Sequence, residues 1–156
     1  MSNATPVAIA LGSNLGDRDA HLDLAVTRLS EILNDLHVSS RIDTAPVDVV
    51  GDQPRYLNAA VVGRTTLAPL DLLLALQAIE REQGRERPYV NAPRTLDLDL
   101  ILYGDRVVAE EQVVVPHPRF RERQFVLAPL AEIAPDLRDP VTGLTVAELL
   151  ARLTAG

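Results

Sequence analysis

The sequence predicts an α+β fold, in which helices cover a mostly antiparallel sheet to form a sandwich. Leucines at every second position from Leu96 to Leu102 have the period of a β-strand, because successive strand side chains point to opposite faces of a sheet. Across residues 19–33, apolar residues recur at helical spacing instead. Strands and helices identified in this way follow the order strand, helix, strands, helix, strands, helices, which is typical of such a sandwich.

Each expected element has its own pattern in the sequence. Short apolar or alternating runs predict strands, and turn-forming residues separate them. Helices are predicted where apolar residues share one face, with Pro69 in a first turn, Gly84 as a stop, and the capping-box spacing of Thr145 and Glu148 as a start. We expect strands at residues 7–11, 38–43, 56–66, 96–102 and 107–115, the last as one or two strands with a turn, and helices at residues 19–33, 69–83, 125–133 and 145–153.

Length and composition restrict the class of protein. A chain of 156 residues, 47% of them hydrophobic, fits one compact domain, which we expect to span residues 1–156. The net charge of −7 argues against binding to nucleic acid, which requires a basic surface. The sequence has no cysteine, no recognisable signal peptide and no run of about 20 apolar residues, so we expect no membrane partner and a cytoplasmic location.

Two acidic residues share the second face of the strand expected at residues 96–102. Asp97 and Asp99 are two positions apart, roughly 6.5 to 7 Å along a strand, so their carboxylates can converge on one Mg²⁺ or on a pair of ions. Arg94, just before the strand, is placed to bind a phosphate. The alternative is the solvated face of an amphipathic strand, but aspartate is disfavoured in strands, and its presence twice favours a functional role.

The basic residues are concentrated near this acidic strand. All fifteen are arginines, and eight of them lie in residues 81–123. A loop at residues 85–94 carries three arginines directly into the acidic strand, which favours phosphate binding over a solvated loop. His117, Arg123 and Phe125 follow at short spacing and suit an anion and an aromatic ring.

Other motifs admit a structural role. The glycine-rich segment at residues 12–17 lacks the lysine and hydroxyl ending of a P-loop, and a plain turn from strand to helix explains its composition. Asn58 is placed to read the polar edge of a heterocycle, although turn capping is the commoner use of asparagine. The loop at residues 44–54 has the length of a binding loop. His21 and His37 have no cluster of polar residues around them, and we expect them at the surface.

Five segments then occur together in one order. They are Gly-Ser-Asn-Leu-Gly at 12–16, Gln-Pro-Arg-Tyr-Leu-Asn-Ala-Ala at 53–60, Pro-Arg-Thr-Leu-Asp-Leu-Asp at 93–99, Val-Pro-His-Pro at 115–118 and Arg-Gln-Phe-Val-Leu-Ala-Pro-Leu at 123–130. In this order and spacing the sequence resembles the 6-hydroxymethyl-7,8-dihydropterin pyrophosphokinase family of folate biosynthesis, over residues 7–137. The resemblance implies a ferredoxin-like α+β fold and transfer of pyrophosphate from ATP to the hydroxymethyl group of the pterin, with release of AMP.

The resemblance also implies a role for each matching position. The implied catalytic residues are Arg85, Arg94, Asp97 and Asp99, and the two aspartates are also the implied ligands of two Mg²⁺ ions. The implied ATP-binding residues are Gln77, Glu80, Arg87, His117 and Arg123. The implied pterin-binding residues are Thr44, Val47, Tyr56, Asn58 and Phe125. The expected partners are therefore ATP, as co-substrate, and hydroxymethyldihydropterin, and we expect a monomer.

One departure from the family pattern affects the second loop. Asn91 stands where many members carry a tryptophan, so we expect this loop to close more loosely or to use Tyr89. Two other functions remain open: a different Mg²⁺-dependent nucleotidyl or phosphoryl transferase, and a non-catalytic module whose acidic face is solvated. Loss of turnover on replacing Asp97 or Asp99 separates the enzymes from the module, and AMP rather than ADP as product identifies pyrophosphate transfer.

Overall fold

The computed structural model describes residues 4–14, 16–44, 55–83 and 96–155. In this part of the chain the main sheet has five strands in the order β2-β4-β1-β5, with β3 also paired to β4. Every pairing in it is antiparallel. The strands are β1 (Thr5–Ser13), β2 (Asn34–Val38), β3 (Ile42–Thr44), β4 (Tyr56–Thr65) and β5 (Asp97–Tyr103).

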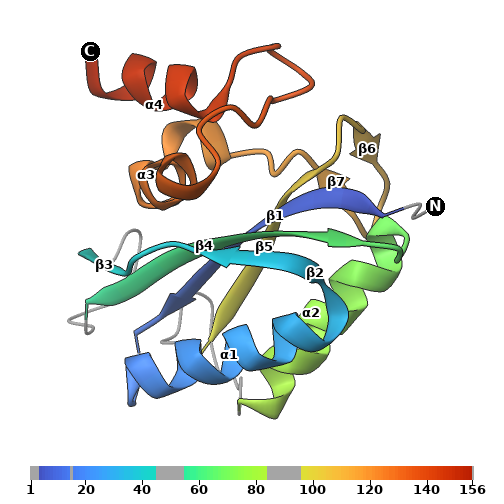
Figure 1. Ribbon diagram of the computed structural model, residues 1–156, viewed down its shortest axis with the longest axis vertical. Helices are drawn as coiled ribbons and strands as arrows, with labels where there is room; N and C mark the ends of the chain where they lie inside the picture. Colours follow the sequence, from blue (N-terminus) through green and yellow to red (C-terminus); the bar gives the residue numbers. More distant parts are fainter. Residues whose placement is uncertain (1–3, 15, 45–54, 84–95, 156) are drawn as a thin grey trace.

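Helices cover both faces of this sheet (Figure 1). α1 and α2 lie on one face, and α3 lies on the other with α4 outside it. The helices are α1 (Arg18–Ile32), α2 (Pro69–Glu82), α3 (Gln124–Ile133) and α4 (Val146–Ala155), and between β5 and α3 the chain forms the hairpin of β6 (Val108–Ala109) and β7 (Val114–Val115) and a short 3₁₀ helix (Phe120–Glu122). The prediction of an α+β sandwich with a mostly antiparallel sheet is confirmed. None of the helices described combines the length and the apolar character that crossing a bilayer requires.

The two faces of the sheet carry side chains of different size. Ile9 and Leu11 of β1 belong to the core under α1 and α2. At the intervening positions Ala8 and Ala10, together with Ala60 of β4, belong to the core under α3 and α4. The sheet face toward α3 therefore carries small side chains along its central strands, β1 and β4.

Helix starts follow their sequence patterns. Asp17 caps α1, where its side chain accepts a hydrogen bond from the backbone N–H of Ala20 at 3.1 Å. Pro69 occupies the first turn of α2, as predicted. Thr145 and Glu148 form the expected capping box before α4: the Glu148 N–H donates to Thr145 Oγ1 at 3.1 Å, and the Thr145 N–H donates to Glu148 Oε1 at 3.0 Å.

The prediction of a single strand at residues 38–43 is wrong, because β2 ends at Val38 and the next strand, β3, begins only at Ile42. The ladder is interrupted at Ser39, whose N–H donates to the Ala60 carbonyl while the Ala60 N–H donates to Ser39 Oγ instead of to a carbonyl. Ser40 then turns away and binds the carboxylate of Glu132 on α3 through its N–H and its hydroxyl.

The alternation of buried leucines in β5 holds through Leu100 and fails at Leu102. Ile9 pairs with Leu100 but its neighbour Ala8 pairs with Leu102, so Ile101 is an extra residue in a β-bulge. A bulge reverses the facing of every residue after it. Leu102 consequently lies in the core under α3 and α4, whereas Leu100 lies in the core under α1 and α2.

His21 is half-buried, contrary to the expectation of a surface residue, whereas His37 is exposed. His21 Nδ1 lies 3.0 Å from Oε1 of Gln83, the residue that ends α2. A methyl group added at Gly16, which has a φ of +71°, would lie 3.2 Å from His21 Nε2. His21 thus links α1 to the end of α2 beside the glycine-rich segment.

A buried ion pair joins the 3₁₀ helix to the connection between α3 and α4. Arg121 donates to the Asp139 carboxylate from Nε at 2.5 Å and from Nη2 at 2.9 Å, and Asp139 is fully buried. The Thr142 hydroxyl and the Val141 N–H also donate to this carboxylate. Burial opposes ionisation of Asp139, but these hydrogen bonds outweigh it and lower its pKa to about 2.

Replacing Asp139 with asparagine is expected to lower the free energy of unfolding at pH 7 by about 3 kcal/mol, because Arg121 loses its charged partner. The folded pKa lies below the ordinary value of 3.8, so the ionised carboxylate stabilises the fold above pH 4 by about 2 kcal/mol, and this contribution is lost as the pH falls through 2. Urea unfolding of both proteins at pH 7 and pH 2.5 measures the effect. Equal midpoints at pH 7 would contradict it, and Glu82→Gln, which removes an exposed ion pair with Arg28, is the control.

Candidate active site

Three strands place polar residues on the sheet face toward α3. Gly12 of β1 pairs with Asn58 of β4 on one side and with Asp97 of β5 on the other. Two positions earlier, Ala10 pairs with Asp99. Since neighbouring strands lie about 4.8 Å apart, Asp97 and Asn58 are roughly 10 Å apart across a residue without a side chain. The acidic pair and the amide thus lie on either side of Gly12.

The two aspartates project from one face of β5. Leu98 and Leu100 belong to the core under α1 and α2, so Asp97 and Asp99 point to the opposite face. Both are half-buried. Mg²⁺ takes one or two carboxylates and completes its octahedron with water and phosphate oxygens, so a half-buried pair on one face fits it. Among the described residues, no group of three or more acidic or histidine side chains gathers as a metal cage.

Asn58 is buried, and its side chain is fixed by β3. Its Nδ2 donates to Thr44 Oγ1 at 2.7 Å, and Asn58 is 6% exposed. Tyr56 pairs with Thr44 and is half-buried. A methyl group added at Gly12 would lie 3.3 Å from Asn58 Oδ1 and 3.6 Å from Tyr56 Cδ1. Thr44, Tyr56 and Asn58, three residues expected around the pterin, are therefore together beside Gly12.

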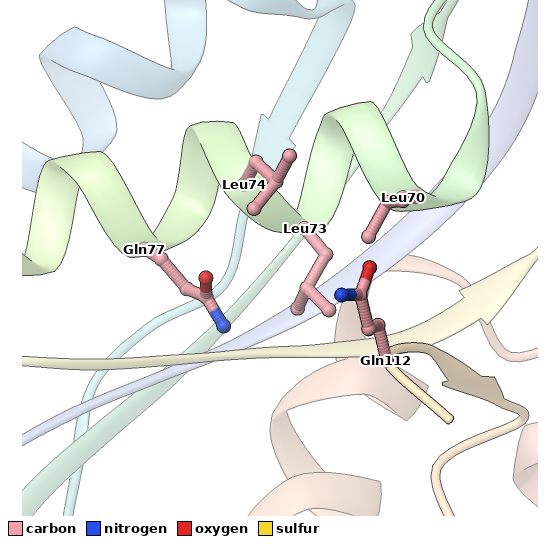
Figure 2. Close-up of a pocket in the computed structure, with 5 residues that line it drawn as sticks. All are labelled: Leu70, Leu73, Leu74, Gln77 and Gln112. Atoms are coloured by element: carbon pink, nitrogen blue, oxygen red, sulfur yellow. The ribbon is translucent and has the colours of Figure 1, made fainter. Parts of the chain in front are cut away.

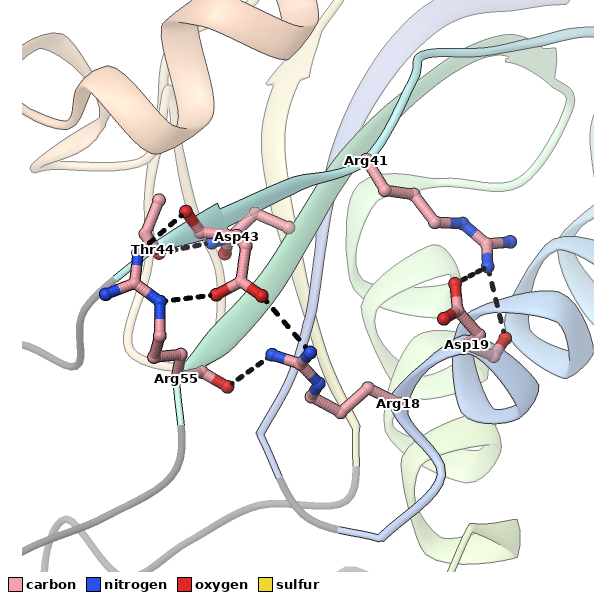
Figure 3. A network of polar contacts seen from close by, with 7 residues as sticks. Arg18, Asp19, Arg41, Asp43, Thr44 and Arg55 are labelled. Carbon is pink, nitrogen blue, oxygen red and sulfur yellow. Dashed lines mark hydrogen bonds and ion pairs between the residues drawn. The ribbon is translucent and has the colours of Figure 1, made fainter.

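A network of arginines supports this corner of the sheet (Figure 3). Arg55 donates to Asp43 Oδ1 from Nε at 2.7 Å, and Arg18 of α1 donates to Asp43 Oδ2 at 3.2 Å. Arg18 also donates to the Arg55 carbonyl at 2.8 Å. Hydrogen bonds from Arg55 and then Arg18 lower the pKa of Asp43. The sequence assigned no role to these residues, although Arg55 lies within one of the five family segments.

The start of α3 brings an aromatic ring over the same face. Phe125 is half-buried and packs against the core that contains Ala10 and Ala60. The Arg123 guanidinium lies 5.7 Å from the centre of the Phe125 ring. Phe125 is thus on the same side of the sheet as the aspartates and Asn58.

His117 is held where the chain leaves the hairpin of β6 and β7. The backbone N–H of His117 donates to the Ile101 carbonyl at 2.9 Å, and this hydrogen bond fixes His117 beside the bulge in β5. Its Nδ1 accepts a hydrogen bond from the Arg119 N–H at 3.2 Å, so in the neutral ring the proton is on Nε2. Burial, followed by the charges of Arg123 and Arg119, lowers the pKa of His117 below its ordinary value.

The midpoint of the His117 ring titration is therefore expected below pH 6.5, the ordinary value. The unfolded chain takes up the proton first as the pH falls, so the stability that the neutral ring provides is present above pH 6.5 and is lost toward the folded pKa. NMR of the ring protons against pH measures this, and Arg123→Gln should raise the midpoint. A midpoint at or above 6.5 in the wild type would contradict the expectation.

Two implied ATP-binding residues lie on α2, which covers the other face of the sheet. Gln77 lines a cavity of about 290 Å³ between α2 and the turn of the hairpin (Figure 2). Glu80 is 4% exposed, and its Oε2 accepts a hydrogen bond from the Leu98 N–H at 2.8 Å. Leucine side chains and two amides line the cavity: Leu70, Leu73, Leu74, Gln77 and Gln112.

Several expected site residues lie outside the described residues. They are Val47 of the first loop and Arg85, Arg87 and Arg94 of the second, together with Tyr89 and Asn91. The described residues thus bring together Asp97, Asp99, Thr44, Tyr56, Asn58 and Phe125 on one sheet face. Gly12, which sequence reasoning assigned to a turn, lies within β1 at the centre of this group.

The structure is that of an α+β domain with two neighbouring carboxylates, Asp97 and Asp99, on one face of the strand at the end of its sheet. The family model for 7,8-dihydro-6-hydroxymethylpterin-pyrophosphokinase (HPPK) matches residues 8–135. This chain belongs to that family.

Individual relatives differ in how much of their length the chain spans. It is 46% identical over 153 residues to the 2-amino-4-hydroxy-6-hydroxymethyldihydropteridine pyrophosphokinase of Pseudomonas aeruginosa, covering 93% of this chain and 90% of that protein. It is 40% identical over 148 residues to a folic acid synthesis protein of Pneumocystis carinii, of which it spans 20%. The crystal structure of wild-type Plasmodium falciparum HPPK-DHPS with pterin and p-hydroxybenzoate matches 99% of this chain with 42% of its own, with a TM-score of 0.76 at 14% identity, and so shares the fold.

Proposed function

We propose that this chain transfers pyrophosphate from ATP to the hydroxymethyl group of 6-hydroxymethyl-7,8-dihydropterin, giving AMP and the pterin diphosphate in folate biosynthesis. Membership of the family and the 46% identity to the P. aeruginosa pyrophosphokinase support this activity. The structural observation that carries it is the row Asp97, Gly12, Asn58 across β5, β1 and β4. In this row a carboxylate, which we propose for metal and phosphate, lies across Gly12 from an amide, which we propose for the heterocycle.

Asp97 and Asp99 would hold two Mg²⁺ ions from one side. When bound, these ions supply neutralisation of phosphate charge and polarisation of the attacking hydroxyl. The protein's own contribution is to keep both carboxylates on one face of a strand that is paired to β1 and buried on its other face. Arg85 and Arg94 keep their proposed roles in binding phosphate oxygens, with Arg87 assisting.

The amide side of the row would hold the pterin. Asn58 offers both donor and acceptor atoms to the polar edge of the ring, and its hydrogen bond to Thr44 fixes its orientation. Tyr56 and Phe125 would pack on the ring faces, because both are half-buried on the α3 side of the sheet, Tyr56 next to Gly12 and Phe125 against the core with Ala10 and Ala60. Val47, on the first loop, is proposed to complete this pocket.

ATP would extend from the aspartates past β5, the edge strand of the sheet, toward α2 and the hairpin. Gln77 and the leucines of the cavity form an apolar slot with amide groups, which suits a flat base. His117 and Arg123 lie on the α3 side, where a neutral imidazole donor and a guanidinium suit phosphate or ribose oxygens.

In the proposed reaction the hydroxymethyl oxygen forms a bond to the β-phosphorus. The bond from that phosphorus to the oxygen shared with the α-phosphorus breaks, AMP leaves with this oxygen, and the hydroxyl proton passes to solvent. No covalent intermediate with the protein is needed, because phosphoryl transfers depend on positioning and charge neutralisation.

Incubation of the purified protein with ATP, Mg²⁺ and hydroxymethyldihydropterin tests the proposal. AMP and the pterin diphosphate are the expected products, in equal amounts. ADP would indicate a simple kinase, and no nucleotide product would reject the activity.

We also propose that residues 1–156 act as one domain and as a monomer. Sedimentation equilibrium measures the oligomeric state. The cytoplasmic location stays a prediction.

A further inference from the structure

Glu80 is one of the few buried charged residues in the described chain, and it contacts the acidic strand from the sheet edge. It lies in the last turns of α2 and is 4% exposed. Its Oε2 accepts a hydrogen bond from the backbone N–H of Leu98 at 2.8 Å. Leu98 is the residue between Asp97 and Asp99, so this hydrogen bond is made at the midpoint of the proposed metal-binding pair.

The position of β5 explains why the Leu98 N–H needs an acceptor. β5 ends the strand order of the main sheet and pairs there with β1. Alternate residues of an antiparallel strand direct their N–H groups to the neighbouring strand or away from it. The Leu98 N–H points away from β1, and without the Glu80 carboxylate a buried donor would lose this partner.

We infer that Glu80 is a positioning residue that fixes the β5 backbone between the two aspartates, a role different from the ATP contact that the family resemblance implies. The inference rests on the proposed function, since it concerns the geometry of the Asp97 and Asp99 pair. A charged acceptor on an N–H makes a stronger hydrogen bond than a neutral one, and α2 is anchored by its own apolar face in the core. Gln77, one turn earlier on α2, faces the cavity instead.

Three substitutions at Glu80 separate positioning from ATP binding. Glu80→Ala removes the acceptor, Glu80→Asp keeps the charge but withdraws it by one methylene, and Glu80→Gln keeps an oxygen at the same reach. Glu82→Ala, at an exposed residue two positions later on α2, is the matched control. The measurements are kcat and KM for ATP at saturating Mg²⁺ and pterin, and the exchange rate of the Leu98 amide by NMR without nucleotide or metal.

We expect Glu80→Ala and Glu80→Asp to lower kcat by about 100-fold, because a small displacement of catalytic groups has effects of this size, with the KM for ATP changed by less than about threefold. The Leu98 amide should exchange faster in both. Glu80→Gln and Glu82→Ala should keep kcat within about threefold of wild type and the Leu98 amide protected. If Glu80→Ala does not fold, Glu80→Asp and Glu80→Gln still give the comparison.

Two results would overturn the inference. One is a raised KM for ATP with unchanged kcat in the Ala and Asp variants, which indicates direct ATP binding. The other is equal loss of kcat in all three variants with unchanged exchange at Leu98, which indicates that the charge acts without the hydrogen bond. A wild-type protein that forms no AMP would reject the proposed function, and it would do so independently of the Leu98 exchange rates.

Discussion

Replacing Asp97 or Asp99 with asparagine is expected to lower the rate of AMP formation by about 1,000-fold, because each substitution removes a charge that we propose to hold metal and phosphate in the transition state. Asparagine has nearly the same shape as aspartate, so the fold should be retained. The rate is measured as AMP formed at saturating ATP, Mg²⁺ and pterin, with circular dichroism of each variant as the check on folding.

Asp105→Asn is the control for this experiment. Asp105 is an exposed aspartate in the turn just after β5, outside the proposed site. Its replacement changes the net charge of the protein by the same amount and should leave the rate within about twofold, as expected for a surface substitution. Wild-type rates in Asp97→Asn and Asp99→Asn would instead support a non-catalytic module with a solvated acidic face.

Gly12→Val is expected to lower kcat/KM for the pterin by about 100-fold, since its side chain would push against Asn58 and Tyr56 and displace the pterin from the proposed site. Even a single methyl group at this position would lie 3.3 Å from Asn58 Oδ1, which is tight contact. Valine suits a strand, so β1 should still form. Steady-state kinetics with the pterin as varied substrate measure the effect, and Gly12→Ala should be intermediate.

A second glycine of the sheet provides the control for Gly12. A methyl group at Gly63 of β4 would lie 3.1 Å from the Asn34 carbonyl oxygen and from Leu33 Cβ, far from the aspartates in the register. Gly63→Ala should lower the thermal midpoint and leave the KM for the pterin unchanged. If both glycine substitutions changed the melting temperature and neither changed the kinetics, the proposal that the pterin binds over Gly12 would be wrong.

Local periodicity was sufficient to predict much of the fold. The alternation around Asp97 placed both carboxylates on one face because side-chain direction in a strand depends only on neighbouring residues. Helix limits followed from caps and prolines, which are also local signals, as at Thr145 and Glu148. The sequence pattern could not place Leu102, because the bulge at Ile101 arises from pairing with β1.

The relation between strands had to come from the structure. Which residue of β4 lies beside Gly12 is a matter of register, and no periodicity in either strand specifies it. Glu80 is a similar case, because sequence reasoning assigned it only a place in the expected helix and an implied ATP contact, while the folded chain buries it against the β5 backbone. Asn58 differs from these two cases, because the family segment at residues 53–60 already indicated it as a site residue. Only its hydrogen bond to Thr44 had to come from the structure.

Mn²⁺ in place of Mg²⁺ tests most directly whether Asp97, Asp99 and Asn58 face one bound substrate, since the two ions accept the same oxygen ligands. With a non-hydrolysable ATP analogue and substoichiometric Mn²⁺, paramagnetic broadening should be strongest at the backbone N–H groups of residues 97–99. It should still be clear at the Gly12 N–H and the Asn58 side-chain amide, which follow across the sheet, and weak at Thr5 at the far end of β1. The doubly substituted D97N/D99N protein should show none of this pattern. Broadening centred elsewhere, or unchanged in the doubly substituted protein, would contradict the assignment of this sheet face as the active site.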